Sequence, residues 1–251
     1  MTRPLEQHQT EIERNAQAWA RKPLLREIYA GFYERIQRLI APEIPGRILE
    51  IGSGIGNLKA HLPEALCTDL FSNPWLDLVC DGYELPFLSG SISHLVLFDV
   101  FHHLEAPNAF LEEARRVLVA SGRLILFEPF VSWSSFPVYG LLHHEPVAWR
   151  ASIASTKRLP RPRRYYAAQG NATRLFFRKE WSGWPEGWRV IHAEAFASFS
   201  YLLSGGFSKR PVYPRAALNG LRRLDQALSR WPTLFGARCV VALEAFRNGP
   251  T

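Results

Sequence analysis

A glycine-rich stretch carries the strongest chemical signal in the chain. It reads Glu50-Ile51-Gly52-Ser53-Gly54-Ile55-Gly56-Asn57. Glycine lets the backbone turn tightly and approach a ligand, and a helix that follows offers free amide donors. The Gly-x-Gly-x-Gly spacing differs from the Gly-x-Gly-x-x-Gly fingerprint of dinucleotide-binding proteins. The stretch therefore predicts a ligand-binding loop, and a tight turn without a ligand is the alternative.

Acidic residues stand at the ends of the apolar runs that follow. If these runs are parallel strands, their ends present side chains at one edge of a sheet. Asp69 lies 17 residues after Gly52, and Asp81 precedes Gly82 at the end of the next run. Asp99 ends a further run in the same way. A carboxylate at such a position can accept both hydroxyls of a ribose. Each of these carboxylates could instead cap a strand end.

Four histidines are candidates for removing a proton near neutral pH, a task that suits imidazole. His102 and His103 follow the run that Asp99 ends, and His143 and His144 stand together in a later segment. We select His102, His103 and His143 as catalytic candidates, although one member of a histidine pair is more often structural. No Cys-x-x-Cys pair or paired-histidine helix is visible, so we expect no metal site.

Strand and helix patterns alternate along the chain, and a hydrophobic content of 47% excludes a disordered protein. Short apolar runs predict strands at 47–51, 65–70, 76–81, 94–99, 123–128, 188–196 and 237–246. Periodic spacing predicts helices within 9–41, 57–62, 109–118 and 216–228. We expect Pro23 to open the second helix of the first range, and residues 200–215 to form a loop. The pattern indicates an α/β fold with a Rossmann-like, seven-stranded, mostly parallel sheet whose last strand is antiparallel.

The stretch from Arg47 to Pro129 resembles the class I S-adenosylmethionine-dependent methyltransferases. It is nearest to the type 11 group, which includes the ubiquinone and menaquinone biosynthesis methyltransferases. The likeness rests on the order of the glycine motif, the strand-end acids and the segments Leu95–Leu104, Leu111–Leu118 and Ser121–Leu124. The resemblance implies a transferase whose cofactor is S-adenosyl-L-methionine and whose product is S-adenosyl-L-homocysteine.

The same resemblance implies how the cofactor is held. The glycine loop would pass under the methionine part, Asp69 would bind the ribose hydroxyls, and Asp81 would bind the adenine amino group. The implied cofactor-binding residues are Glu50, Gly52, Ser53, Gly54, Gly56, Asn57, Asp69, Leu70, Asp81, Gly82, Phe98 and Asp99.

We expect four parts in the chain. Residues 1–45 form an N-terminal helical segment, and residues 46–129 form the Rossmann-like cofactor-binding core. Residues 130–186 are rich in Trp, Tyr, Pro and Arg, and we expect an insertion after the fifth strand that caps the substrate site. Residues 187–251 complete the sheet and add a basic helix.

Charge is distributed unevenly along the chain. The net charge is +7, from 30 basic and 23 acidic residues. Residues 1–130 hold 12 basic and 17 acidic residues, which gives −5, and residues 131–251 hold 18 and 6, which gives +12. Because arginines beside aromatic rings can clamp an anion, we expect Arg161, Arg163 and Arg164 to bind the acceptor. A solvated basic loop is the alternative.

These observations predict a methyltransferase that acts on a small-molecule or lipid-linked, anionic acceptor. An RNA methyltransferase and a catalytically idle binding module are the alternatives, and the glycine spacing disfavours a nicotinamide-dependent dehydrogenase. Nucleic acid is not favoured, because the arginines are interrupted by prolines and resemble no RNA-binding fold. No run is long enough for a membrane helix, and Cys67, Cys80 and Cys239 fit reduced core residues. We expect a cytoplasmic protein whose basic half can contact the inner face of the membrane.

Overall fold

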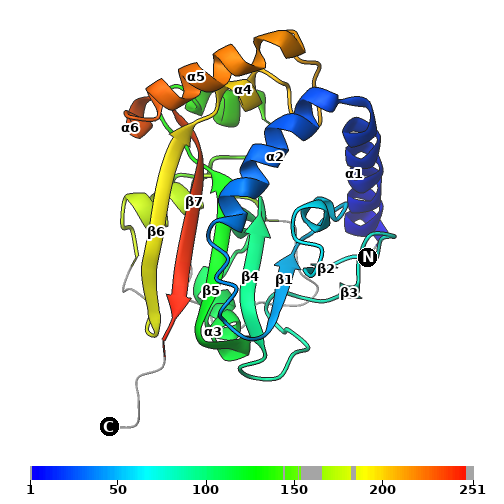
Figure 1. Cartoon of the computed structure of the whole chain (residues 1–251), viewed down its shortest axis with the longest axis vertical. Helices are drawn as coiled ribbons and strands as arrows, with labels where there is room; N and C mark the ends of the chain where they lie inside the picture. Colours follow the sequence, from blue (N-terminus) through cyan, green and yellow to red (C-terminus); the bar gives the residue numbers. More distant parts are fainter. Residues whose placement is uncertain (1, 144, 152, 154–165, 182–184, 247–251) are drawn as a thin grey trace.

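The chain folds around a single seven-stranded sheet in the order β3-β2-β1-β4-β5-β7-β6 (Figure 1). A computed structural model describes residues 2–143, 145–151, 153, 166–181 and 185–246. The strands are β1 Arg47–Ile51, β2 Leu66–Asp69, β3 Leu78–Val79, β4 Ile92–Phe98, β5 Leu118–Pro129, β6 Trp188–Ala197 and β7 Gly236–Ala245. The last strand, β7, pairs antiparallel with both β5 and β6, and the pairs among β1 to β5 are parallel. The predicted fold class is confirmed.

Both faces of the sheet are buried, which explains why its central strands are apolar almost throughout. The helix α2 (Pro23–Gln37) packs on one face, against residues such as Ile48 and Val96. The helix α3 (Pro107–Val117) packs on the other face, against Leu95 and Leu97. Successive residues of β4 thus point to opposite layers, as strand geometry requires.

The two N-terminal helices precede the sheet in the chain and cover part of its carboxyl edge. The helix α1 (Thr2–Arg21) is followed at once by α2, which Pro23 opens in its first turn, as expected. Lys22 lies between the two helices in the chain. Its Nζ atom donates to the carbonyl oxygens of Gly206 at 2.6 Å and Lys209 at 2.6 Å. This contact ties the junction of the two helices to the loop that follows β6.

The connection between β1 and β2 is shorter than in a regular βαβ unit. It contains only a single turn of 3-10 helix, η1 (Asn57–Ala60), instead of the predicted helix over 57–62. Its N-cap residue Gly56 has a left-handed backbone, with φ of 68°. A one-turn helix contributes little dipole to a ligand at this loop.

The described part of the insertion lies against the carboxyl end of β4 and β5. It contains two π-helical turns, η3 (Val138–Leu142) and η4 (Thr173–Phe177). The amide of Val131 donates to Thr173 Oγ1 at 2.9 Å, and the amide of Ala168 donates to the carbonyl of His102 at 2.9 Å. These bonds hold both ends of the insertion at the edge where the sheet presents its strand ends.

The C-terminal part adds β6 and β7 and the helices between them. These are α4 (Phe199–Leu202), η5 (Arg215–Ala217), α5 (Leu218–Leu228) and α6 (Pro232–Phe235); a further turn, η2 (Phe101–His103), follows β4. The basic helix starts two residues later than predicted, and α4 occupies part of the expected loop over 200–215. In Figure 1 α4, α5 and α6 lie at the end of the sheet toward which β4 and β5 point. Among the described residues no helix is both long and apolar enough to cross a membrane.

Candidate active site at the carboxyl edge of the sheet

The glycine loop turns through three left-handed residues, with φ of 70° at Gly52, 53° at Gly54 and 68° at Gly56. A side chain at Gly52 would begin 2.4 Å from Val100 Cγ2, so this position requires glycine. Among the described residues, a Cβ added at Gly54 would meet Ile12 Cδ1 of α1, at 3.7 Å. The space beside the Cα of Gly54 is therefore open except toward α1.

Serine 53 fixes the loop to the neighbouring strand. Its amide donates to the carbonyl of Thr68 at 2.8 Å, and its Oγ accepts from the amide of Thr68 at 2.9 Å. The loop is thus held in register with the end of β2, where Asp69 stands. This arrangement explains why a serine inside the motif serves the fold as well as the site.

The carboxylate of Asp69 is buried and oriented toward the glycine loop. Oδ2 accepts from the amide of Gly54 at 3.0 Å, and Oδ1 accepts from the amide of Leu70 at 2.7 Å. These two bonds orient the carboxylate at the end of β2, where the resemblance places the ribose hydroxyls.

The acidic turn after β3 borders the same edge. Asp81 Oδ1 accepts from the amide of Tyr83 at 3.0 Å, which holds the carboxylate at the start of the turn. A Cβ at Gly82 would lie 3.6 Å from both Ile51 and Phe110, so the backbone there packs closely on the core. Leu70 is 43% exposed beside Asp69. The expected adenine side of the site is thus formed by the ends of β2 and β3.

Glu50 lies beneath the loop and is buried. Burial raises its pKa to about 7, although hydrogen bonds from Ser53 and Cys67 act in the opposite direction. A carboxylate held in this state binds a proton or a cation more readily than an exposed one. Glu50 is therefore suited to pairing with a positively charged part of a ligand.

Phe98 and Asp99 end β4 within an aromatic layer. The Phe98 ring stacks on Phe127 at 4.7 Å between centroids, and Asp99 has a left-handed backbone with φ of 57°. The Asp99 carboxylate accepts from Arg238 at 2.7 Å, and the Arg238 side chain is only 2% exposed. The sequence analysis did not select Arg238, yet a single arginine within the apolar run 237–243 was a usable signal.

His102 is enclosed by two carboxylates. Its Nδ1 lies 2.6 Å from Glu128 Oε2, and its Nε2 lies 3.3 Å from Glu145 Oε2. Burial lowers the pKa of His102, but the two carboxylates outweigh burial and raise it to about 10. In this arrangement His102 carries a proton on both ring nitrogens near neutral pH, which disfavours it as a free base.

His103 differs from its neighbour in charge and exposure. Its Nδ1 donates to the carbonyl oxygen of Tyr166 at 2.9 Å, and its Nε2 lies 3.5 Å from Glu145 Oε1. Burial and the adjacent His102 lower its pKa to about 4, so the ring is neutral at pH 7. The side chain is 32% exposed, so an acceptor can reach it more readily than His102.

The third candidate, His143, joins the same cluster through Gln169. The Nε2 of Gln169 donates to His143 Nδ1 at 2.7 Å and to Glu145 Oε2 at 3.0 Å. The structure therefore brings His102, His103 and His143 together, and their role in catalysis stays a prediction. Glu128 and Gln169 were missed. Glu128 closes the predicted strand 123–128 and lies one residue before the end of β5, so the rule that selected Asp69 would have found it, whereas nothing in the sequence marked Gln169.

The predicted acceptor arginines Arg161, Arg163 and Arg164 lie outside the described residues. Two described arginines of the insertion support its own fold: Arg174 Nε lies 2.8 Å from Glu180 Oε2, and Arg178 stacks 4.3 Å from the Trp149 ring centroid. The positive charges of Arg174 and Arg178 are thus used in contacts within the insertion.

Comparisons with known proteins agree with this geometry. Residues 49–126 match the family model of the methyltransferase domain Methyltransf_11. A chain from the complex between the Haloferax volcanii Trm112 methyltransferase activator and a methyltransferase is 16% identical, with a TM-score of 0.54 over 98% of this chain and 99% of that one. A Thermotoga maritima protein described as a "possible histamine N-methyltransferase" is 15% identical, with a TM-score of 0.53 over 93% and 97%. No curated protein matches the sequence.

The family match falls on the glycine loop and the strand ends that form the site, and the overall fold is that of these solved structures. Residues 49–126 thus match a methyltransferase domain of the type 11 group, and the chain has the class I S-adenosylmethionine-dependent methyltransferase fold. Its cofactor is accordingly S-adenosylmethionine.

Proposed function

We propose that this methyltransferase modifies a small-molecule or lipid-linked, anionic acceptor that binds beneath the insertion. The observation that carries the proposal is the cover over the histidine cluster. Tyr166 and Gln169 of the insertion bond to His103 and His143, and Glu145 reaches both His102 and His103. A site enclosed in this way suits a small acceptor group better than a folded RNA, which requires a broad and open basic surface.

The residues of the loop and strand ends fit the cofactor. The open backbone at Gly54, the oriented carboxylate of Asp69 and the buried Glu50 would hold it. When bound, S-adenosylmethionine supplies an electrophilic methyl group on a positively charged sulfonium. The protein must therefore orient the acceptor atom, exclude water and accept a proton where the acceptor carries one. Of the three histidine candidates, the neutral and partly exposed His103 is the best placed to meet an acceptor.

Exposed apolar side chains next to the cluster support a lipid-linked acceptor. Leu141 and Leu142 are 76% and 63% exposed and directly precede His143. Trp133 is 78% exposed, and its amide donates to the carbonyl of Thr233 at 3.2 Å, which joins the insertion to α6. We call the exposed residues Trp133, Leu141, Leu142, Trp231 and Leu234 the apolar rim.

One basic residue adjoins the apolar rim. Arg230 is exposed and directly precedes Trp231. Tryptophan and leucine beside lysine and arginine are typical of surfaces that contact anionic lipid headgroups. A lipid-linked acceptor could then enter the site from the membrane side, and the arginines at 161–164 would bind its anionic group.

The proposal is tested by incubating the pure enzyme with separated cell fractions and with S-adenosylmethionine that carries a label in its methyl group. We expect label in the lipid or small-molecule fraction, and label confined to RNA would overturn the proposal. The joint change Arg161→Ala, Arg163→Ala and Arg164→Ala should raise the KM for the acceptor and leave cofactor affinity unchanged. A charge-matched control removes the exposed arginines Arg38, Arg189 and Arg223 and should leave the KM unchanged.

A further inference from the structure

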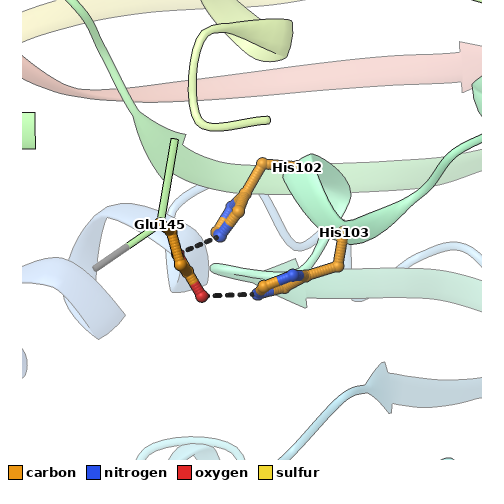
Figure 2. A group of neighbouring side chains, drawn as sticks. All are labelled: His102, His103 and Glu145. Atoms are coloured by element: carbon orange, nitrogen blue, oxygen red, sulfur yellow. Dashed lines mark ion pairs between the residues drawn. The ribbon is translucent and has the colours of Figure 1, made fainter. Parts of the chain in front are cut away.

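The histidine cluster has the arrangement of a metal site. Figure 2 shows His102 and His103, which follow β4, directed toward the carboxylate of Glu145 from the insertion. The Nε2 atoms of the two rings lie 3.3 Å and 3.5 Å from the carboxylate oxygens. One potential ligand atom from each residue lies within 4.8 Å of the other two. Three potential ligands from two segments, the turn after β4 and the insertion, thus converge on one small volume.

Each imidazole is held by a second partner at its other nitrogen. His102 Nδ1 lies 2.6 Å from Glu128 Oε2, and the amides of Val100 and Phe101 donate to Glu128 Oε1 at 2.8 Å and 2.6 Å. His103 Nδ1 donates to the carbonyl oxygen of Tyr166 at 2.9 Å. Metal-binding histidines are oriented in this way, by a carboxylate or a backbone carbonyl that fixes the ring and its tautomer.

The bond to Tyr166 has a consequence for the atoms that face Glu145. A carbonyl oxygen only accepts, so the Nδ1 atom of His103 carries a hydrogen, and Nε2 is the ring nitrogen that can bind a metal ion. This Nε2 atom faces the carboxylate oxygen of Glu145 at 3.5 Å.

The potential ligand atoms are close enough to share one ion. Zinc binds imidazole nitrogen and carboxylate oxygen at about 2.0–2.2 Å, so ligand atoms of one ion lie roughly 3–4 Å apart. The Glu145 carboxylate offers Oε2 at 3.3 Å from His102 Nε2 and Oε1 at 3.5 Å from His103 Nε2, and one potential ligand atom from each of the three residues lies within 4.8 Å of the other two. We propose that His102, His103 and Glu145 bind a divalent transition-metal ion of the zinc type, with one coordination position left for water or an acceptor atom.

Gln169 adds a further polar group beside this site. Its side chain is 2% exposed, and its Nε2 donates to Glu145 Oε2 at 3.0 Å. Its buried Oε1 has no hydrogen-bond partner in the described part of the chain. An ion or its bound water at the cluster offers a partner to such an oxygen. Binding the ion displaces the proton that His102 shares with Glu145, so the exchange is balanced by release of that proton.

Placed at the carboxyl edge, the ion would lower the pKa of a coordinated acceptor group and help to orient it. This role rests on the proposed function, but the binding of the ion does not. The sequence analysis expected no metal because the three ligands come from positions 102, 103 and 145 and form no short spacing motif.

The experiment is a calorimetric titration of chelator-treated protein with Zn²⁺, followed by Co²⁺ as a spectroscopic probe of tetrahedral geometry. We expect one ion per chain, and at least tenfold weaker affinity in His103→Ala and in Glu145→Gln. Glu128→Gln, which changes the carboxylate that orients His102 but no proposed ligand, should weaken affinity about 10- to 100-fold. The control His192→Ala removes an exposed histidine that lies 3.7 Å from Glu194, and it should not change the affinity.

Circular dichroism and thermal unfolding establish that each variant is folded. Absence of stoichiometric binding in the folded wild-type protein, or equal affinity in wild type, His103→Ala and Glu145→Gln, overturns the metal site. Cofactor affinity is measured on the same samples without an acceptor. A protein that binds S-adenosylmethionine but no ion refutes the metal site alone, and an ion-binding protein that labels only RNA refutes the proposed acceptor alone.

Discussion

The part of the site proposed to hold the cofactor and the part proposed to hold the acceptor are built in different ways, and we call them the cofactor half and the acceptor half. The cofactor half comes from one stretch, Glu50 to Asp99, and depends on backbone turns and on carboxylates that end neighbouring strands. The acceptor half combines His102 and His103 with Glu145 and Gln169, which lie far along the chain in the insertion. A site made from local turns is marked in the sequence, whereas a site made from side chains of distant segments is not.

The largest effect is expected from a substitution in the glycine loop of the cofactor half. Gly54→Val should abolish S-adenosylmethionine binding measured by calorimetry, because it places a β-branched side chain at a left-handed residue where the backbone must meet the ligand. The control Gly31→Ala lies in α2, where an added Cβ meets nothing within 4 Å, and should bind normally. Unchanged affinity in a folded Gly54→Val protein would contradict the site.

Glu50→Gln tests the cofactor half in two ways, because its effect on protein stability can be measured apart from its effect on cofactor binding. The pKa of Glu50 is raised from 4.5 to about 7 in the folded protein, so its ionisation costs stability as the pH rises between these values. Glutamine avoids this cost. The variant should therefore be more stable than wild type at pH 8, on the order of 3 kcal/mol, with the difference vanishing below pH 4.5.

The same variant tests how Glu50 serves the cofactor. Because the cofactor is positively charged, its affinity for wild type should rise between pH 6 and pH 8 as Glu50 ionises, by about tenfold. Glu50→Gln should bind weakly at both pH values and lose this dependence. A pH-dependent affinity that persists in Glu50→Gln would assign the titration to another group.

Asp69→Ala removes a charged acceptor from the ribose side of the site. Loss of its hydrogen bonds should weaken S-adenosylmethionine binding by about 1.5–3 kcal/mol, measured by calorimetry at constant pH. The control Glu64→Ala removes an exposed carboxylate shortly before β2 and should have no effect. Equal affinities in the two variants would remove Asp69 from the site.

The smallest effect concerns the apolar rim of the acceptor half. Leu141→Ser with Leu142→Ser should lower partitioning onto anionic vesicles about tenfold, since each leucine loses apolar contact with lipid. Unfolding free energy should change by less than about 0.5 kcal/mol, because both residues are exposed. Leu88→Ser, which alters an 82% exposed leucine before β4, is the control. Vesicle binding that is identical in all three proteins would refute a membrane role for the rim.

The elements that were predicted well have strong local causes. Apolar runs such as 47–51 and 94–99 became β1 and β4, and Pro23 opened α2, because burial on both faces and ring geometry leave little choice. Boundaries shifted where pairing decided them: β5 begins at Leu118 rather than Arg123, since Ile92 of β4 pairs with Leu118. The short turn η1 replaced a predicted helix, because the loop from Gly52 to Gly56 is held to β2 by Ser53 and Asp69.

The sequence by itself determined the fold class, the glycine loop and the strand-end carboxylates, because hydrophobic period and turn chemistry act over a few residues. Only the tertiary structure decided the state of the histidines. His102 and His103 are adjacent and alike in sequence, yet one is held between two carboxylates with its pKa raised to about 10, and the other is bonded to Tyr166 with its pKa lowered to about 4. Electrostatic environment depends on which distant groups fold against a side chain, and no local pattern encodes that arrangement.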